Sequence, residues 1–171
     1  LSQISVAAPK AFLDSLWPWF RSVVELIAND PHPFVNSYQE DYSLGTLGDR
    51  TEGVPDQPIS ALHDAVVALS EKEPEQFLTF FRQNIDSPYM TIHRLLCTGL
   101  LKLAASYPHV ILDYLTSDPR RLAVGDSFDC HKASRRLIAA VVPHLDEKGR
   151  HKLENACLLY TSDAADEGLG V

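Results

Sequence analysis

Cysteine is scarce in this chain, which has only Cys97, Cys130 and Cys157 among its 171 residues. A small disulfide-stabilised secreted domain needs a dense, even set of cysteines, and a structural zinc site needs four ligands at short spacings. The seven histidines do not complete such a site, because they are scattered along the chain. Cys130 and His131 are adjacent and would point in different directions on a helix. We therefore expect no metal, no cofactor and a cytoplasmic location.

Positive charge and long apolar runs are lacking too. The chain has 15 Lys and Arg against 23 Asp and Glu, and its net charge is −8. A nucleic-acid-binding surface needs a basic face, so this balance argues against one. No run approaches the roughly 18 apolar residues that a membrane-spanning helix needs. We expect the partner to be a protein or the rest of the chain's own polypeptide, and neither nucleic acid nor a membrane.

Catalytic motifs that can be recognised from their spacing are absent as well. There is no Gly-rich phosphate loop ending in Lys-Ser/Thr, no Gly-x-Ser-x-Gly turn and no His-Glu-x-x-His pair. Hydrophobic residues make up 45% of the chain and charged residues 22%, a balance that allows a buried core. The sequence therefore indicates a folded domain that is not an enzyme.

Helical periodicity is what the sequence does contain. Between residues 9 and 29, apolar side chains recur every three or four positions, which places them on one face of a helix. Pro18 lies inside this pattern and predicts a kink or a break. Further helices are predicted at 58–72, from 74, from 88, from 108, over 131–144 and from 146. No long segment alternates apolar and polar residues like a strand, so the predicted fold class is all-α.

Residues 30–57 show no helical period and contain three prolines and three glycines. They predict one long loop, which is uncommon inside a compact domain and is often functional. The aromatic residues Phe34, Tyr38 and Tyr42 suggest that the first half of this loop packs on the helices.

A faint internal repeat points to the arrangement of the helices. Ile-His-Arg-Leu-Leu at 92–96 resembles Ser-Arg-Arg-Leu-Ile at 134–138, about 42 residues later, a period typical of HEAT-like helix pairs. Stacked helical hairpins bury apolar faces that one hairpin leaves open. We therefore predict HEAT-like stacked hairpins, a fragment of an α-solenoid, with one continuous core that includes Leu95, Leu96, Leu100, Ile111, Leu115, Leu137, Ile138 and Val141.

The end of the chain is expected to have a different origin. Residues 157–167 resemble the conceptual translation of a transposase-type sequencing-library adapter, and such scars are set aside before fold reasoning. We interpret residues 1–156 as the natural helical-repeat domain, an open-ended fragment of metagenomic origin, and residues 157–171 as a non-native tail. Residues 163–171 are expected to pack on nothing, and the last helix is expected to run on through Leu158 and Leu159.

Most of residues 9–156 resembles the C-terminal helical repeats of large bacterial ATP-binding proteins of the STAND NTPase type. The resemblance is carried by the phrases at 87–95, 114–122, 134–138 and 143–145, with similar stretches at 16–19 and 30–33. In such proteins an effector and an NTPase precede a repeat array that senses a ligand, and many act in defence against phage. The resemblance implies a sensor or scaffold role for this chain and carries no catalytic residue to it.

One group of charges is a candidate binding site. Arg120, Arg121 and Arg135, with Asp126, lie beside the connector at 122–129, where we expect exposed charge to contact a partner carboxylate or phosphate. The alternative is that the arginines of this region pair locally with acidic residues and stabilise the turn. The runner-up function is a helical enzyme domain whose site uses the 122–131 connector.

Overall fold

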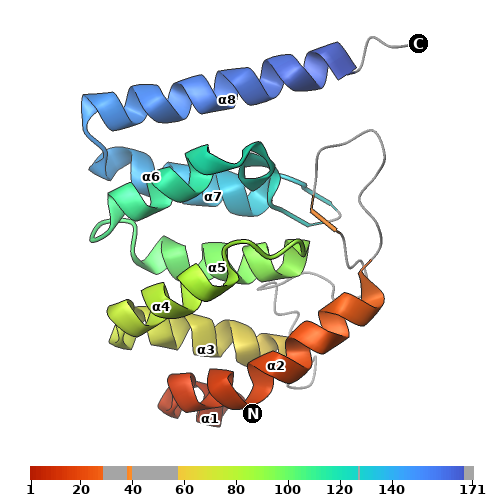
Figure 1. Cartoon of the computed structure of the whole chain (residues 1–171). Helices are drawn as coiled ribbons and strands as arrows, with labels where there is room; N and C mark the ends of the chain where they lie inside the picture. Colours follow the sequence, from red (N-terminus) through yellow and green to blue (C-terminus); the bar gives the residue numbers. More distant parts are fainter. Residues whose placement is uncertain (29–37, 40–57, 127, 168–171) are drawn as a thin grey trace.

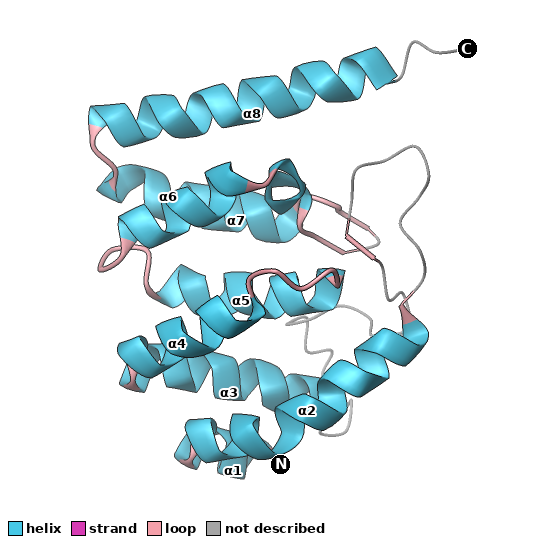
Figure 2. Ribbon diagram, viewed as in Figure 1, coloured by secondary structure: helices cyan, strands magenta, loops and turns pink. Residues whose placement is uncertain are grey.

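The computed structural model describes residues 1–28, 38–39, 58–126 and 128–167, with side chains described as far as residue 159. These residues form helices and contain no strand, so the all-α prediction is confirmed for the described part (Figures 1 and 2). The elements are α1 (Ser2–Ala7), α2 (Pro9–Ile27), α3 (Pro58–Lys72), α4 (Pro74–Asn84), α5 (Met90–Lys102), α6 (Pro108–Ser117), η2 (Pro119–Ala123), α7 (Lys132–Val141), η3 (Val142–His144) and α8 (Glu147–Glu167).

Proline and aspartate mark the predicted helix starts. A proline suits the first helical position because its backbone has no N–H to leave unpaired there. Four helices begin this way, at Pro9, Pro58, Pro74 and Pro108. At the start of α8, the Asp146 carboxylate accepts a hydrogen bond from the Gly149 N–H at 2.7 Å, which satisfies one of the free amides of the first turn.

The amino-terminal end departs from the prediction in two ways. Helix α1 was not predicted, because Ser2–Ala7 is too short to show a period. Pro18 does not split α2, which runs from Pro9 to Ile27 without interruption. Pro18 and Asp14 are both exposed, so water can satisfy the Asp14 carbonyl that a proline four residues later leaves unpaired.

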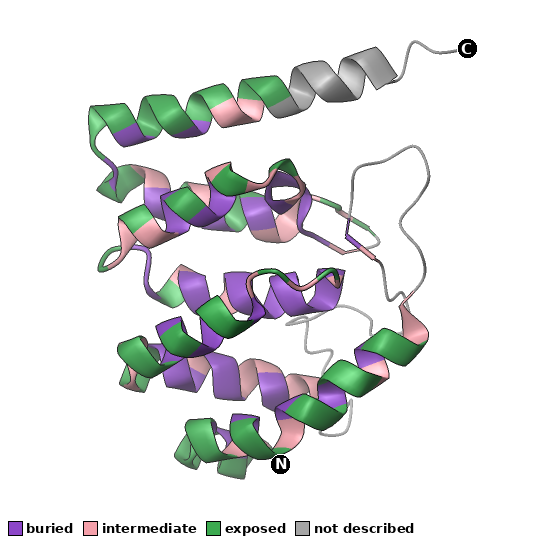
Figure 3. Ribbon diagram, in the orientation of Figure 1, coloured by how far each residue is buried: buried purple, intermediate pink, exposed green. Residues whose placement is uncertain are grey.

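The helices follow one another in an ordered stack. Helix α3 packs against α1, α2, α4 and α5, helix α5 packs in turn against α7, and α6 packs against α8. Figure 1 shows the chain rising from α1 and α2 at one end to α8 at the other. The predicted continuous core is present: seven of its eight named residues are buried and Ile138 is partly buried against them. Buried residues line the middle of the stack in Figure 3.

One part of the predicted loop is anchored on the helices. Tyr38 is 1% exposed, as its aromatic character predicted. Next to it, the Gln39 N–H donates to the Pro88 carbonyl at 2.8 Å, and the Gln39 carbonyl accepts from the Met90 N–H at 2.9 Å. These bonds tie residues 38–39 to the start of α5. The predictions for Phe34, Tyr42 and the rest of 30–57 lie outside the described residues.

Helix α8 continues through Leu158 and Leu159 as predicted, and both side chains are 66% exposed. Its buried contact with the core comes earlier, at Leu153. The prediction that residues 163–171 pack on nothing concerns side chains outside the described residues. Across the described part of the chain, no helix combines the length and apolar character that crossing a membrane requires.

Candidate functional site

Two polar centres adjoin α5, and they share Cys97. The first, here called the central cluster, consists of Tyr38, His93, Tyr114 and Arg121. The second, here called the cationic hollow, is an open depression between α5 and α7 whose charged residues are Arg94, Asp126, Lys132 and Arg136.

Arg121 was expected on the surface, and the structure corrects that expectation. The side chain is 6% exposed. Its Nη1 donates to the Tyr114 carbonyl at 3.3 Å and to the Ser117 hydroxyl at 2.5 Å, and its Nη2 donates to the Ile85 carbonyl at 3.1 Å. The guanidinium also lies 4.9 Å from the centre of the Tyr114 ring, a cation–π contact. Arg121 therefore joins η2 to α6 and to Ile85, the residue that follows α4, from inside the protein.

His93 is the second fully buried polar residue of the central cluster. Its Nε2 lies 2.8 Å from the Ser87 carbonyl, which can only accept, so Nε2 carries the proton. Its Nδ1, 3.0 Å from the Tyr114 hydroxyl, then accepts from that hydroxyl. Burial lowers the pKa of His93 to about 4, although the hydrogen bond to Ser87 acts in the opposite direction. His93 is therefore neutral at neutral pH.

Cys97 completes this network without becoming reactive. Its Sγ lies 3.6 Å from the Tyr114 hydroxyl, one helical turn beyond His93 on α5. Burial raises the pKa of the Cys97 thiol to about 12 and raises that of Tyr114 well above its ordinary value. A thiol in this state is a poor nucleophile, because the thiolate is the reactive form.

Arg120 and Asp118 hold Tyr38 from outside the core. Arg120 Nη2 and Nε donate to the Asp118 carboxylate at 2.7 and 3.1 Å, and the guanidinium lies 4.7 Å from the Tyr38 ring centre. The other face of the Tyr38 ring stacks on His93, with ring centres 3.8 Å apart. Burial alone would raise the pKa of Asp118, but the hydrogen bonds from Arg120 outweigh it and the pKa is lowered. Arg120 thus fixes the anchored segment by local pairing.

The connector is built around hydrogen bonds from side chain to backbone. Asp126 Oδ1 accepts from the amides of Phe128 and Asp129, both at 3.0 Å. The Arg135 guanidinium pairs with the Asp129 carboxylate. A side chain at Gly125 would place its Cβ 2.1 Å from the Asp129 carbonyl oxygen, so this close turn requires glycine.

Ser134 joins the connector to α7. Its hydroxyl accepts from the Val124 N–H at 2.8 Å and donates to the Arg121 carbonyl at 2.9 Å. The Val124 carbonyl in turn accepts from the amides of Ala133 and Ser134, both at 3.0 Å, which caps the first turn of α7. The sequence motif Ser-Arg-Arg at 134–136 therefore contains a buried structural serine followed by two exposed arginines.

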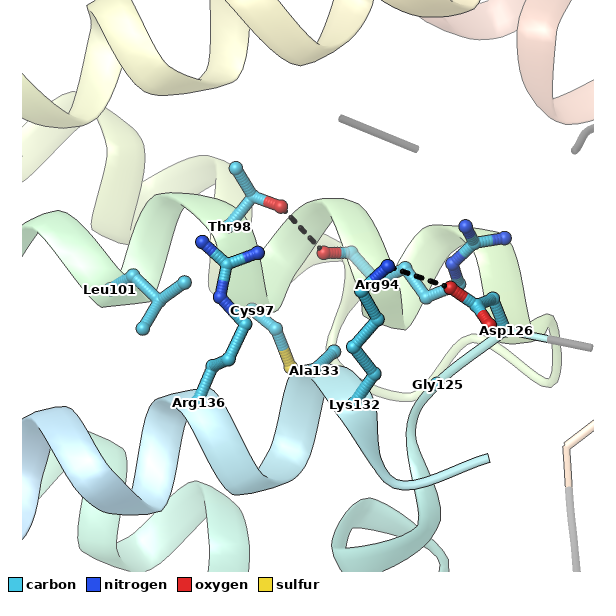
Figure 4. Close-up of a pocket in the computed structure, with 9 residues that line it drawn as sticks. All are labelled: Arg94, Cys97, Thr98, Leu101, Gly125, Asp126, Lys132, Ala133 and Arg136. Atoms are coloured by element: carbon cyan, nitrogen blue, oxygen red, sulfur yellow. Dashed lines mark hydrogen bonds and ion pairs between the residues drawn. The ribbon is translucent and has the colours of Figure 1, made fainter. Parts of the chain in front are cut away.

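The cationic hollow has one basic side chain from α5 and two from α7. Figure 4 shows Lys132 and Arg136 extending from α7 toward the α5 face that carries Arg94 and Thr98. Lys132 Nζ lies 3.3 Å from Asp126 Oδ2. Arg136 is exposed and makes no ion pair with any residue that the structure describes. Arg94 and Lys132 were missed at the sequence level, because 94 and 132 are far apart in the chain.

Of the four residues predicted to bind a partner, the structure brings Arg120 and Arg121 to Tyr38 and Tyr114, and Asp126 and Arg135 to the connector. Partner binding by these residues stays a prediction. Within the described ranges, no three or more His, Cys, Asp and Glu side chains gather as a metal ion would require.

Comparison of the chain with protein-family models, with curated proteins and with solved structures gives no match. Function is therefore inferred from the chain's own residues.

Proposed function

We propose that this chain is a non-catalytic scaffold or sensor segment, part of the helical-repeat region of a multidomain bacterial NTPase. One observation carries the non-catalytic part. Three side chains with acid, base or nucleophile chemistry hold the fold: His93 and Cys97 bond to Tyr114, and Asp126 bonds to backbone amides. A general base or nucleophile needs a free lone pair facing a substrate, and the reactive atoms of these three side chains are engaged by other groups of the protein.

The repeat part of the proposal is supported by the order of packing. Helices α1, α3, α5 and α7 contact one another in succession, α3 also packs against α2 and α4, and α6 contacts α8. A HEAT-like solenoid places consecutive hairpins so that each contacts only its neighbours. The connection to an NTPase, and to phage defence, rests on the resemblance of the sequence phrases to STAND-type repeats.

Hydrogen exchange on the whole chain tests the repeat arrangement. A stack held by nearest-neighbour contacts opens from its ends, so amides of α8 should exchange at a lower opening free energy than those of α3 and α5. A single opening free energy shared by every slowly exchanging amide, from α3 to α8, would contradict the repeat proposal.

Activity assays test the non-catalytic part against the enzyme alternative at 122–131. We expect no turnover above buffer when the chain is incubated with ATP, GTP and chromogenic phosphate and carboxylate esters. Turnover that Asp126→Asn or His131→Gln abolishes, in a variant that still unfolds cooperatively, would favour the enzyme. The NTPase connection has its own test, since the reading frame upstream should encode a Gly-rich phosphate loop.

A further inference from the structure

We propose that the outer face of α2 binds the same face of a second copy of this chain, with the two helices antiparallel. The inference goes beyond the scaffold role and stands whether or not the chain belongs to an NTPase. It rests on three observations: an exposed helix face without charge, serine hydroxyls that are already bonded within the helix, and a charged edge that is complementary to itself.

The outer face of α2 is exposed and carries no charged residue. At about 3.6 residues per turn, six exposed positions fall on it, opposite the side that Leu13 and Phe20 bury in the core (Figure 3). They are Ala11, Ser15, Pro18, Trp19, Ser22 and Leu26. Trp19 is 50% exposed and Leu26 is 84% exposed, although both side chains are large and apolar. Contiguous exposed apolar surface of this kind marks an interaction site.

The two serines of this face present no free hydroxyl proton to a partner. The Ser15 hydroxyl donates to the Ala11 carbonyl at 2.9 Å, and the Ser22 hydroxyl donates to the Pro18 carbonyl at 3.1 Å. A second helix can therefore cover both serines without leaving an unpaired donor. Because serine and alanine are small, they also allow that helix to approach closely.

The outer face is complementary to itself in the antiparallel orientation. When the contact is centred between Pro18 and Trp19, positions equally far from that centre face each other. Leu26 then faces Ala11 of the second copy, and Ser22 faces Ser15. The same residues meet from both sides, which is the isologous contact of a dimer with two-fold symmetry.

The charged residues of α2 favour the same orientation. Four exposed charges lie along one edge of the outer face: Lys10, Asp14, Arg21 and Glu25. Two-fold symmetry places the charged edges of an antiparallel pair side by side. Lys10 then faces Glu25 of the second copy and Asp14 faces Arg21, so every contact along the edge joins opposite charges. A parallel pair would place the two charged edges on opposite sides of the dimer.

The dimer is expected to be weak. One helix face is smaller than the roughly 800 Å² per partner of a standard interface, and ion pairs at its edge remain exposed to water. We therefore expect a dissociation constant of about 10–100 μM. The charge pattern contributes orientation and specificity more than affinity.

Sedimentation equilibrium of the whole chain, from about 1 μM to about 1 mM, tests the dimer. The average mass should rise with concentration toward twice the monomer mass of 19.0 kDa. Leu26→Glu should weaken association at least about tenfold, because it brings a charge into the contact. Leu158→Glu is the matched control, an exposed leucine on α8 at the other end of the stack, and should associate like the wild type.

The charged edge allows a second test that altered folding would not imitate. Asp14→Arg alone and Arg21→Asp alone should each associate more weakly than the wild type, because each places like charges together in its own dimer. An equimolar mixture of the two variants should associate again, since opposite charges then face each other. A wild type that stays monomeric up to about 1 mM would overturn the proposal. So would a dimer that Leu26→Glu leaves unchanged, or a mixture that associates no better than its components.

Discussion

The central cluster and the cationic hollow use the same side chain for opposite purposes. Arg121 is 6% exposed and donates to carbonyls from two other segments, so its guanidinium is engaged inside the protein. Arg136 is exposed and has no ion-pair partner among the described residues. The two arginines are 15 positions apart in similar Arg-Arg pairs. The comparison teaches that an Arg-Arg pair in the sequence can contact a partner only where the structure leaves one of the two guanidinium groups unpaired.

The largest expected effect is the loss of Arg121. Arg121→Ala should lower the free energy of unfolding by roughly 3–4 kcal/mol, because it leaves buried carbonyls unpaired and opens a cavity. Arg121→Met should cost less, since it refills most of the volume without burying a charge. Urea unfolding at neutral pH measures both. A decrease in the free energy of unfolding of about 0.5 kcal/mol or less for Arg121→Ala is the range of ordinary surface changes. Such a result would mean that Arg121 contributes no more to folding than the exposed Arg136.

His93 gives the central cluster a pH dependence close to neutral pH. Its pKa falls from 6.5 to about 4 on folding, so the unfolded chain takes up the proton first. Stability should therefore be complete above pH 6.5 and fall by up to about 3 kcal/mol as the pH drops toward 4. Urea unfolding across this range should show the slope in the wild type and a much smaller one in His93→Gln. Equal slopes in the wild type and in His93→Gln would mean that groups other than His93 cause the pH dependence of stability.

Removing the Ser134 hydroxyl tests how much its hydrogen bonds stabilise the connector. Ser134→Ala should cost about 1–2 kcal/mol, because the Val124 amide and the Arg121 carbonyl both lose a buried partner. Ser106→Ala is a suitable control, since Ser106 is exposed, and it should stay within about 0.5 kcal/mol of the wild type. Similar small losses in both variants would show that the connector is held by other contacts.

Arg120→Ala should have a smaller effect, about 1 kcal/mol or less, because a partly exposed ion pair and one cation–π contact contribute little each. Its local consequence should be clearer. The Gln39 amide, bonded to the Pro88 carbonyl, should exchange faster with deuterium when Tyr38 loses its outer contact. Unchanged exchange of this amide would mean that the other contacts of the segment fix it without Arg120, among them the stacking on His93 and the hydrogen bond from the Tyr38 hydroxyl to Asp118.

Much of the fold was predictable, because helix starts and apolar faces are local signals. The prolines at 9, 58, 74 and 108 and the cap at Asp146 marked real helix starts. Tyr38 was correctly expected to be buried. The break offered as one alternative at Pro18 was wrong, because the cost of a proline depends on whether the carbonyl it frees faces water, and the sequence alone does not show that.

The candidate site was less predictable, for a geometric reason. Arg120 and Arg121 are adjacent in the tight 3-10 turn η2, where successive side chains point about 120° apart. One therefore reaches Tyr38 at the edge and the other Tyr114 in the core. The hollow could not be read from spacing at all, since Arg94 and Lys132 meet only when α5 packs on α7.

The central claim is that the buried Arg121 guanidinium is needed for folding, whereas the exposed Arg136 guanidinium is not. Urea unfolding of Arg136→Gln beside Arg121→Ala tests it most directly. We predict that Arg136→Gln stays within about 0.5 kcal/mol of the wild type while Arg121→Ala loses roughly 3–4 kcal/mol. An Arg136→Gln variant destabilised by more than about 1 kcal/mol would contradict the account.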